Sequence, residues 1–168
     1  MRLKVVVFCG MVVVGICVAV ASAQQGGAQP APERKPAPTT EAGFWTLEEQ
    51  VGHMKDLMKE KKTNWPFYQE PAYNTEMRNL TGKQPVLVHA KRVDFMVIRD
   101  GGGTFVAGGE LVEGKTGNGG DMSGTGIKGG TTKVLKAGDV VYVPAGVPHY
   151  FSNIPDHVTE ILVRWDVK

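Results

Sequence analysis

Residues 138–153 read GDVVYVPAGVPHYFSN, and this stretch decides the fold. A turn at Gly138 leads into a valine-rich strand, which ends at Pro144 because proline lacks the N–H that a sheet ladder needs. Gly146 permits a tight reversal, and the chain re-enters a strand at His149. The spacing predicts a histidine that a rigid turn holds in a fixed place, as a ligand requires.

Short β-forming segments separated by turns extend on both sides of this stretch. Residues 100–103, DGGG, are interpreted as a turn, which makes 93–99 and 104–107 the two strands of a hairpin. Many short strands with turns between them predict an antiparallel β-sandwich or a small barrel. The expected strands are 73–80, 85–89, 93–99, 104–107, 134–135, 140–143, 149–151 and 158–167.

One helix is expected before the strands. Thr46 and Glu49 fit a capping box, and the helix should end before Asn64, which starts an Asn-Trp-Pro sequence. His53 falls away from the apolar residues and is expected to face solvent. The packing face, or alternatively a dimer contact, is expected at the apolar residues with helical spacing: Leu47, Val51, Met54 and Met58.

The N-terminus has the three parts of a secretory signal peptide. Arg2 and Lys4 form a short basic region, residues 5–20 are an apolar run, and Ala-Ser-Ala at 21–23 is a cleavage signal. A membrane anchor is the alternative, but the run is short and interrupted by glycine. We therefore predict that residues 1–23 are removed and that the protein is exported, to the periplasm or the extracellular space.

The mature chain has a composition that excludes some function classes. Both cysteines, Cys9 and Cys17, lie in the leader, so cysteine thiolate chemistry is excluded. Arg2 and Lys4 account for two of the 19 basic residues, which leaves 17 against 17 acidic residues. With no basic stripe, a nucleic-acid partner is not expected, and no membrane contact is expected after cleavage.

Two further segments differ in composition from the rest. Residues 24–43 are rich in proline and alanine and are expected to be a flexible linker before a single domain at 44–168. Residues 113–130 are dense in glycine and are expected to be a mobile inter-strand loop, a candidate lid over a site. A phosphate-binding loop is excluded there, because no strand–loop–helix pattern surrounds the glycines.

The spacing from Gly138 to Asn153, with Pro144, Gly146 and His149 between them, resembles the second conserved motif of the cupin family. The resemblance covers residues 85–166 and is to small, single-domain cupins of the type-2 kind. It implies an all-β fold, an antiparallel β-barrel or double-stranded jelly roll, here with one N-terminal helix.

The first cupin motif is degenerate in this chain. In residues 86–101, VLVHAKRVDFMVIRDG, His89 matches the family's second histidine, Asp94 stands where the family has glutamate, and Leu87 replaces the first histidine. The resemblance implies that His89, Asp94 and His149 hold one divalent transition metal, Fe, Mn, Zn or Ni. It also implies a ligand pocket, lined by Leu87, Met96, Ile98 and Phe151.

Two functions remain open from the sequence. One is a metal-dependent enzyme, oxygenase- or isomerase-like, that acts on a small molecule at the His/Asp/His site. The alternative is a metal-free cupin that binds a small ligand without catalysis. No catalytic acid or base is assigned, although Tyr142, Tyr150 and Glu160 are expected in the pocket or at its rim. His157 is expected at the surface, because it lies in a turn region.

Overall fold

The computed structural model describes residues 36–168. The predicted signal peptide and residues 24–35 of the predicted linker lie outside the described residues. In the described part, no helix is long and apolar enough to cross a membrane. Antiparallel β-structure with one helix, α1 (Leu47–Glu60), confirms the predicted fold class. The strands are β1 (Asn64–Gln69), β2 (Tyr73–Leu80), β3 (Val86–Val88), β4 (Arg92–Ala107), β5 (Glu110–Val112), β6 (Lys115–Thr116), β7 (Met122–Gly124), β8 (Gly126–Lys128), β9 (Thr131–Lys136), β10 (Val140–Val143), β11 (His149–Asn153) and β12 (Val158–Asp166).

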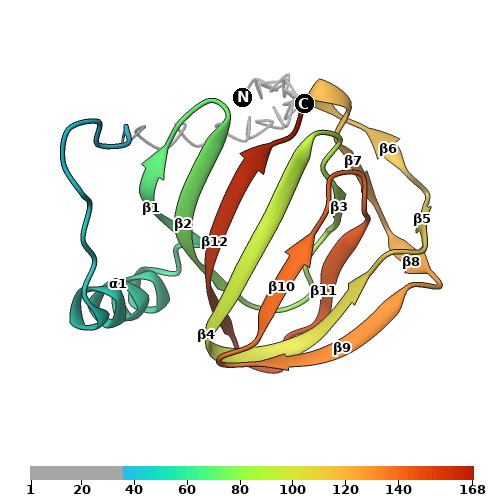
Figure 1. Cartoon of the computed structure of the whole chain (residues 1–168). Coiled ribbons are helices and arrows are strands. Elements are labelled where there is room, and N and C mark those ends of the chain that lie inside the picture. The colour runs from blue at the N-terminus through green and yellow to red at the C-terminus, as the bar shows by residue number, and fades with distance from the viewer. Residues whose placement is uncertain (1–35) are drawn as a thin grey trace, which may run out of the picture. The chain divides into compact units, whose positions relative to one another are not determined.

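The long strand β4 belongs to two sheet regions. Its first half pairs with β12 and β10, and its second half pairs with β11 and β9 (Figure 1). The hydrogen-bonded order across residues 36–168 is β1-β2-β12-β4-β11-β3-β7-β6, a path with two open ends. The architecture is therefore a jelly roll and not a closed barrel.

The hairpin predicted at residues 100–103 is wrong, because β4 runs straight through this position. Gly101 has a φ of 68°, and a Cβ there would lie 2.0 Å from the carbonyl oxygen of His157. A Cβ at Gly102 would lie 2.4 Å from the carbonyl oxygen of Leu135. The glycines allow neighbouring backbones to approach closely where the strand changes partners, which is a second use of glycine besides turns.

The surroundings of His157 also differ from the prediction of a surface side chain. The side chain is 15% exposed, with Nδ1 2.8 Å from Asp156 Oδ2 and Nε2 3.1 Å from Asp100 Oδ2. Burial opposes the charged form, but the hydrogen bonds to the two carboxylates outweigh it and raise the pKa of His157. The imidazole therefore ties the turn before β12 to Asp100 in the middle of β4.

The helix begins as predicted, but a different face packs. Both hydrogen bonds of the capping box between Thr46 and Glu49 are present. Leu57, which was not in the predicted stripe, is 2% exposed against Phe67 and Met77, whereas Leu47 is 63% exposed. Met58 is also exposed, so the predicted packing face is wrong at both of its ends.

The expectation that His53 faces solvent is wrong as well. Its ring stacks on Trp65 at a centroid distance of 3.5 Å. The helix contacts β1 and β2, and its apolar cluster is separate from the main core that contains Met96, Phe151 and Leu162. The helix therefore packs on the sheet without contributing to the core in which the site lies.

The glycine-rich segment 113–130 is not the irregular loop that was predicted. β7 pairs with β3, and β8 pairs with β5. A Cβ at Gly124 would lie 2.5 Å from the side chain of Leu111, so this glycine serves close packing. The segment extends the sheet next to β3 and brings Asp121 to 3.0 Å from Nδ1 of His89.

Candidate metal centre and ligand cavity

His149 reaches the interior from the turn that precedes β11. Gly146 adopts a φ of 79°, the left-handed region that glycine tolerates, and its N–H donates to the carbonyl oxygen of His89 at 2.8 Å. His149 then pairs with Leu87 of β3 on one side and Ala107 of β4 on the other. The same turn therefore places one histidine and fixes the backbone of the other.

The hydrogen bond at His149 Nδ1 determines what its other nitrogen presents. Nδ1 lies 2.9 Å from the carbonyl oxygen of Val147, which can only accept, so Nδ1 carries a proton. A neutral His149 therefore directs the lone pair of Nε2 toward Asp94, at 3.5 Å from Oδ2. Two acceptors in this position need a proton or a metal ion between them.

His89 is arranged in the same way by a residue that the sequence analysis missed. Its Nδ1 lies 3.0 Å from Oδ2 of Asp121, and the other oxygen of Asp121 accepts from the N–H of Ala90 at 2.9 Å. An ionised carboxylate only accepts, so Nδ1 of His89 carries the proton. Nε2 of His89 therefore faces Oδ2 of Asp94, at 3.8 Å.

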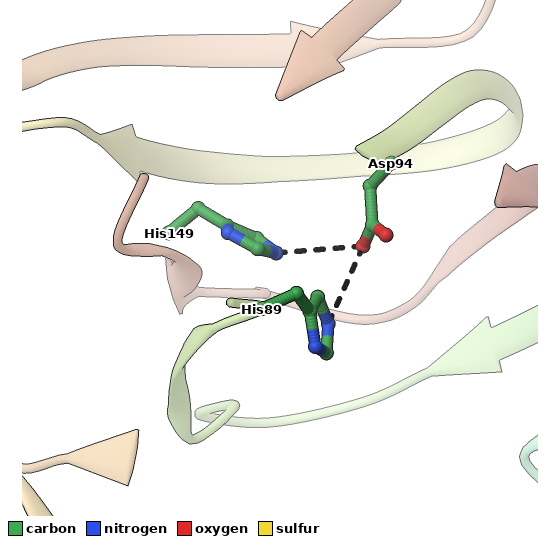
Figure 2. A group of neighbouring side chains, drawn as sticks. All are labelled: His89, Asp94 and His149. Carbon is green, nitrogen blue, oxygen red and sulfur yellow. Dashed lines mark ion pairs between the residues drawn. The ribbon is translucent and has the colours of Figure 1, made fainter. Parts of the chain in front are cut away.

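The three predicted metal ligands are thus brought together. One ligand atom from each of His89, Asp94 and His149 lies within 4.8 Å of the others, and the side chains point toward one another (Figure 2). Asp94 is 2% exposed and His149 is 6% exposed. Metal–nitrogen bonds of about 2.1 Å place neighbouring ligand atoms roughly 3 to 3.5 Å apart, so a small inward movement would complete the contacts. Two imidazoles with fixed Nδ1 protons and one carboxylate are a donor set that fits a divalent transition metal.

Arg164 contacts the same carboxylate and was not predicted. It lies directly opposite Asp94 in the pairing of β12 with β4. Its Nε donates to Oδ1 of Asp94 at 2.9 Å, and its terminal nitrogen donates to Oδ2 at 3.0 Å. That terminal nitrogen also lies 3.5 Å from Nε2 of His89. The guanidinium therefore orients Asp94 and borders the cluster.

These contacts determine the protonation of Asp94. Burial alone would raise the pKa of Asp94, but the neighbouring His149 and the charge and hydrogen bonds of Arg164 hold it well below its usual range. The group is therefore an ionised carboxylate at neutral pH, the form that a metal ion or an imidazolium requires.

A cavity of about 310 Å³ opens beside the cluster. Its size is at the lower end of the range for small-molecule sites. The predicted pocket residues Leu87, Met96 and Phe151 line it, together with Phe105 and Tyr150. Ile98, also predicted for the pocket, lies in the hydrophobic core instead, and Tyr142 is exposed.

A second arginine–carboxylate pair lies at the wall of this cavity. Arg78 of β2 is opposite Glu160 of β12, with Nε 3.1 Å from Oε1. Glu160 is 0% exposed, and burial raises its pKa despite the charge of Arg78. The residue expected at the pocket rim is therefore a fully buried acid that reaches the cavity only through its partner arginine.

Comparison with known proteins gives a family and several structural likenesses. The Cupin_2 model, a cupin domain, matches residues 123–164. A search of curated proteins found no significant match.

Three solved structures illustrate the likeness. The Cnp3 cupin domain of Schizosaccharomyces pombe is 15% identical with a TM-score of 0.42, and the alignment covers 62% of this chain and 64% of that one. The protein NMB1881 of Neisseria meningitidis is 10% identical with a TM-score of 0.46, and the alignment covers 74% of this chain and 100% of that one. A cupin 2 conserved barrel domain protein of Rhodopseudomonas palustris is 16% identical with a TM-score of 0.43, and the alignment covers 62% of this chain and 60% of that one.

Proposed function

Because the chain belongs to the cupin superfamily, we propose that it binds a small organic molecule beside one divalent transition metal held by His89, Asp94 and His149. The observation that carries the proposal is the outer hydrogen bonding of both imidazoles. Val147 and Asp121 hold the two Nδ1 protons, so both Nε2 atoms face one ionised carboxylate. Outer partners of this kind orient metal-binding histidines and set their tautomers.

The residues around the metal position have separate roles in this proposal. A bound divalent metal would supply Lewis-acid chemistry or a site for oxygen activation, of use in an oxygenase- or isomerase-type reaction. Arg164 holds the carboxylate of Asp94 in place through two hydrogen bonds. Phe105 and Phe151 pack next to the cluster and exclude water from that side of the cavity.

The alternative is a metal-free cavity that binds a ligand without catalysis, and one observation favours it. Arg164 already neutralises Asp94 through both carboxylate oxygens, at 2.9 and 3.0 Å. In this alternative, a proton between His149 and Asp94 takes the place of the metal. The two functions share the cavity and differ in metal content.

Metal analysis separates the two functions. The protein, purified without chelators, is expected to contain about one equivalent of a transition metal by elemental mass spectrometry. His149→Ala and the more conservative His149→Gln should lose the metal, whereas His53→Ala, a histidine on α1 that stacks on Trp65, should keep it. Metal at 100 times its Kd should stabilise the fold by about 2.7 kcal/mol.

A wild-type protein without metal would contradict the metal proposal if Fe(II), Mn(II), Zn(II) and Ni(II) also left its melting temperature unchanged. The metal-free alternative would then stand. Equal metal content in the wild type and in both His149 variants would place the metal elsewhere.

Export is part of the same proposal. It is supported by the basic start, the apolar run and the Ala-Ser-Ala signal of residues 1–23. A site that acts outside the cytoplasm would take its metal and ligand from the periplasm or the medium. N-terminal sequencing of the protein recovered from the expression host should begin at Gln24, and an intact N-terminus would contradict export by cleavage.

A further inference from the structure

Arg78 is placed to contact whatever fills the cavity. It extends from β2 into the interior, its side chain is 20% exposed, and it lines the same cavity as Asp94 and His149. The cavity therefore has the His/Asp/His cluster at one part of its wall and a second cationic group at another.

The guanidinium of Arg78 has unused hydrogen-bond donors. Arginine carries five N–H donors in a planar fork. Within residues 36–168, the Arg78 side chain makes one ion pair, between Nε and Glu160 at 3.1 Å, and even this Nε has no hydrogen-bond partner of good geometry. Arg164, by contrast, donates two hydrogen bonds to Asp94.

The carboxylates nearby leave the charge of Arg78 poorly compensated. Glu76 accepts a hydrogen bond from Asn64 at 3.2 Å and lies 4.0 Å from Arg164, so it is partnered by residues other than Arg78. Glu160 has no hydrogen bond on either oxygen, and burial favours its neutral form. A partly buried arginine beside a carboxylic acid that resists ionisation is a site for an added anion.

We propose that Arg78 binds the carboxylate of a small organic acid, through its terminal guanidinium nitrogens. The planar fork of arginine matches the two oxygens of a carboxylate. The apolar part of the acid would lie along Met96, Phe105 and Phe151, toward His149. This inference deepens the proposed function and rests on the cavity being a small-molecule site.

The experiment compares acids with amides of the same shape. Isothermal titration calorimetry of the purified full chain would use hexanoate against hexanamide, and benzoate against benzamide. The acids should bind roughly 10- to 100-fold more tightly than the amides, the range of a charge-assisted hydrogen bond. Arg78→Gln should remove this preference, and Glu160→Gln, which replaces the neighbouring carboxyl group with an amide that cannot ionise, should keep or increase it.

A folding control is needed because Arg78→Gln leaves Glu160 without a partner. The double variant Arg78→Gln/Glu160→Gln replaces both members of the pair together and should fold while lacking the preference for acids. Acids that bind no more tightly than amides, or that do not bind at all, would overturn the inference. So would a preference for acids that persists in the double variant.

The metal content of the same preparations keeps this test separate from the proposed metal site. A preference for acids that depends on Arg78 supports the inference whether or not metal is present. A protein with metal but without that preference retains the metal site and loses the assignment of Arg78.

Discussion

Two arginine–carboxylate pairs among the described residues, Asp94 with Arg164 and Glu160 with Arg78, are built differently. Asp94 and Arg164 are joined by two hydrogen bonds, and two histidines lie against the same carboxylate. Arg78 and Glu160 lie 3.1 Å apart without a hydrogen bond of good geometry, and Glu160 is more deeply buried than any group of the first pair.

The difference shows how burial and hydrogen bonding act on the same kind of ion pair. Where hydrogen bonds satisfy the carboxylate, its charged form is stabilised and its position is defined. Where they are missing, burial dominates and favours the neutral acid. The first pair is suited to orienting ligands of a metal, and the second to responding to a charge that enters the cavity.

The largest expected effect is the loss of Arg164. Arg164→Met leaves the ionised Asp94 buried without its main partner and should lower the free energy of unfolding by about 3 to 5 kcal/mol, measured by urea denaturation. Added transition metal should recover part of this loss if it binds at Asp94. Arg92→Met is the matched control, because Arg92 and Asp166 form a partly exposed pair and should be worth less than about 1 kcal/mol. Equal losses of unfolding free energy in the two variants would show that the buried Arg164–Asp94 pair contributes no more to stability than the partly exposed Arg92–Asp166 pair.

The pH dependence of stability should separate the two carboxylates, since their pKa values shift in opposite directions. The pKa of Asp94 is lowered in the fold, so its contribution is present above the ordinary value of 3.8 and is lost as the pH falls. The pKa of Glu160 is raised, so its contribution is present below the ordinary value of 4.5 and is lost as the pH rises.

Urea unfolding from pH 2 to pH 8 tests this difference. The wild type should lose stability as the pH falls below 4 through Asp94, and Asp94→Asn should flatten that acid limb. Glu160→Gln should instead remove a decline in the free energy of unfolding as the pH rises above 4.5. If Asp94→Asn flattened the limb above pH 4.5, or Glu160→Gln flattened the acid limb, the two carboxylates would have been assigned the wrong way round.

A smaller effect is expected from Asp121, which acts on the cluster through His89. Asp121→Asn weakens the acceptor that holds Nδ1 of His89, and metal affinity should fall roughly 10- to 100-fold. Competition with a chelator measures the affinity, and the melting temperature without metal should change little. Glu113→Gln is the control, because Glu113 lies in the same glycine-rich segment and contacts Thr125 instead. Loss of affinity in both variants would indicate a general effect of the segment.

The predictions from the sequence succeeded where local geometry decides the outcome. The glycine and proline spacing at 138–149 gave the turn, the alternation after it turned His149 inward, and the capping box at Thr46 began the helix. They failed where glycine has two uses: at Gly101 it marks a close approach of strands and not a turn. The helix face also shifted, because what packs against α1 is set by the strands beneath it.

Arg164, Asp121 and Arg78 were missed for a common reason. Each matters because of the residue opposite or beside it, and those partners are 70, 32 and 82 positions away in the chain. Arg164 and Arg78 owe their partners to strand register, which no local pattern in the sequence states. Asp121 depends on the glycine-rich segment joining the sheet at β3.

The sequence by itself determined the antiparallel β class, the turn before His149 and the nature of the donor groups, since backbone preferences and side-chain alternation act over a few residues. Only the tertiary structure decided which charges meet in the interior. Strand pairing set Asp94 against Arg164 and Glu160 against Arg78, and burial then shifted the two carboxylates in opposite directions.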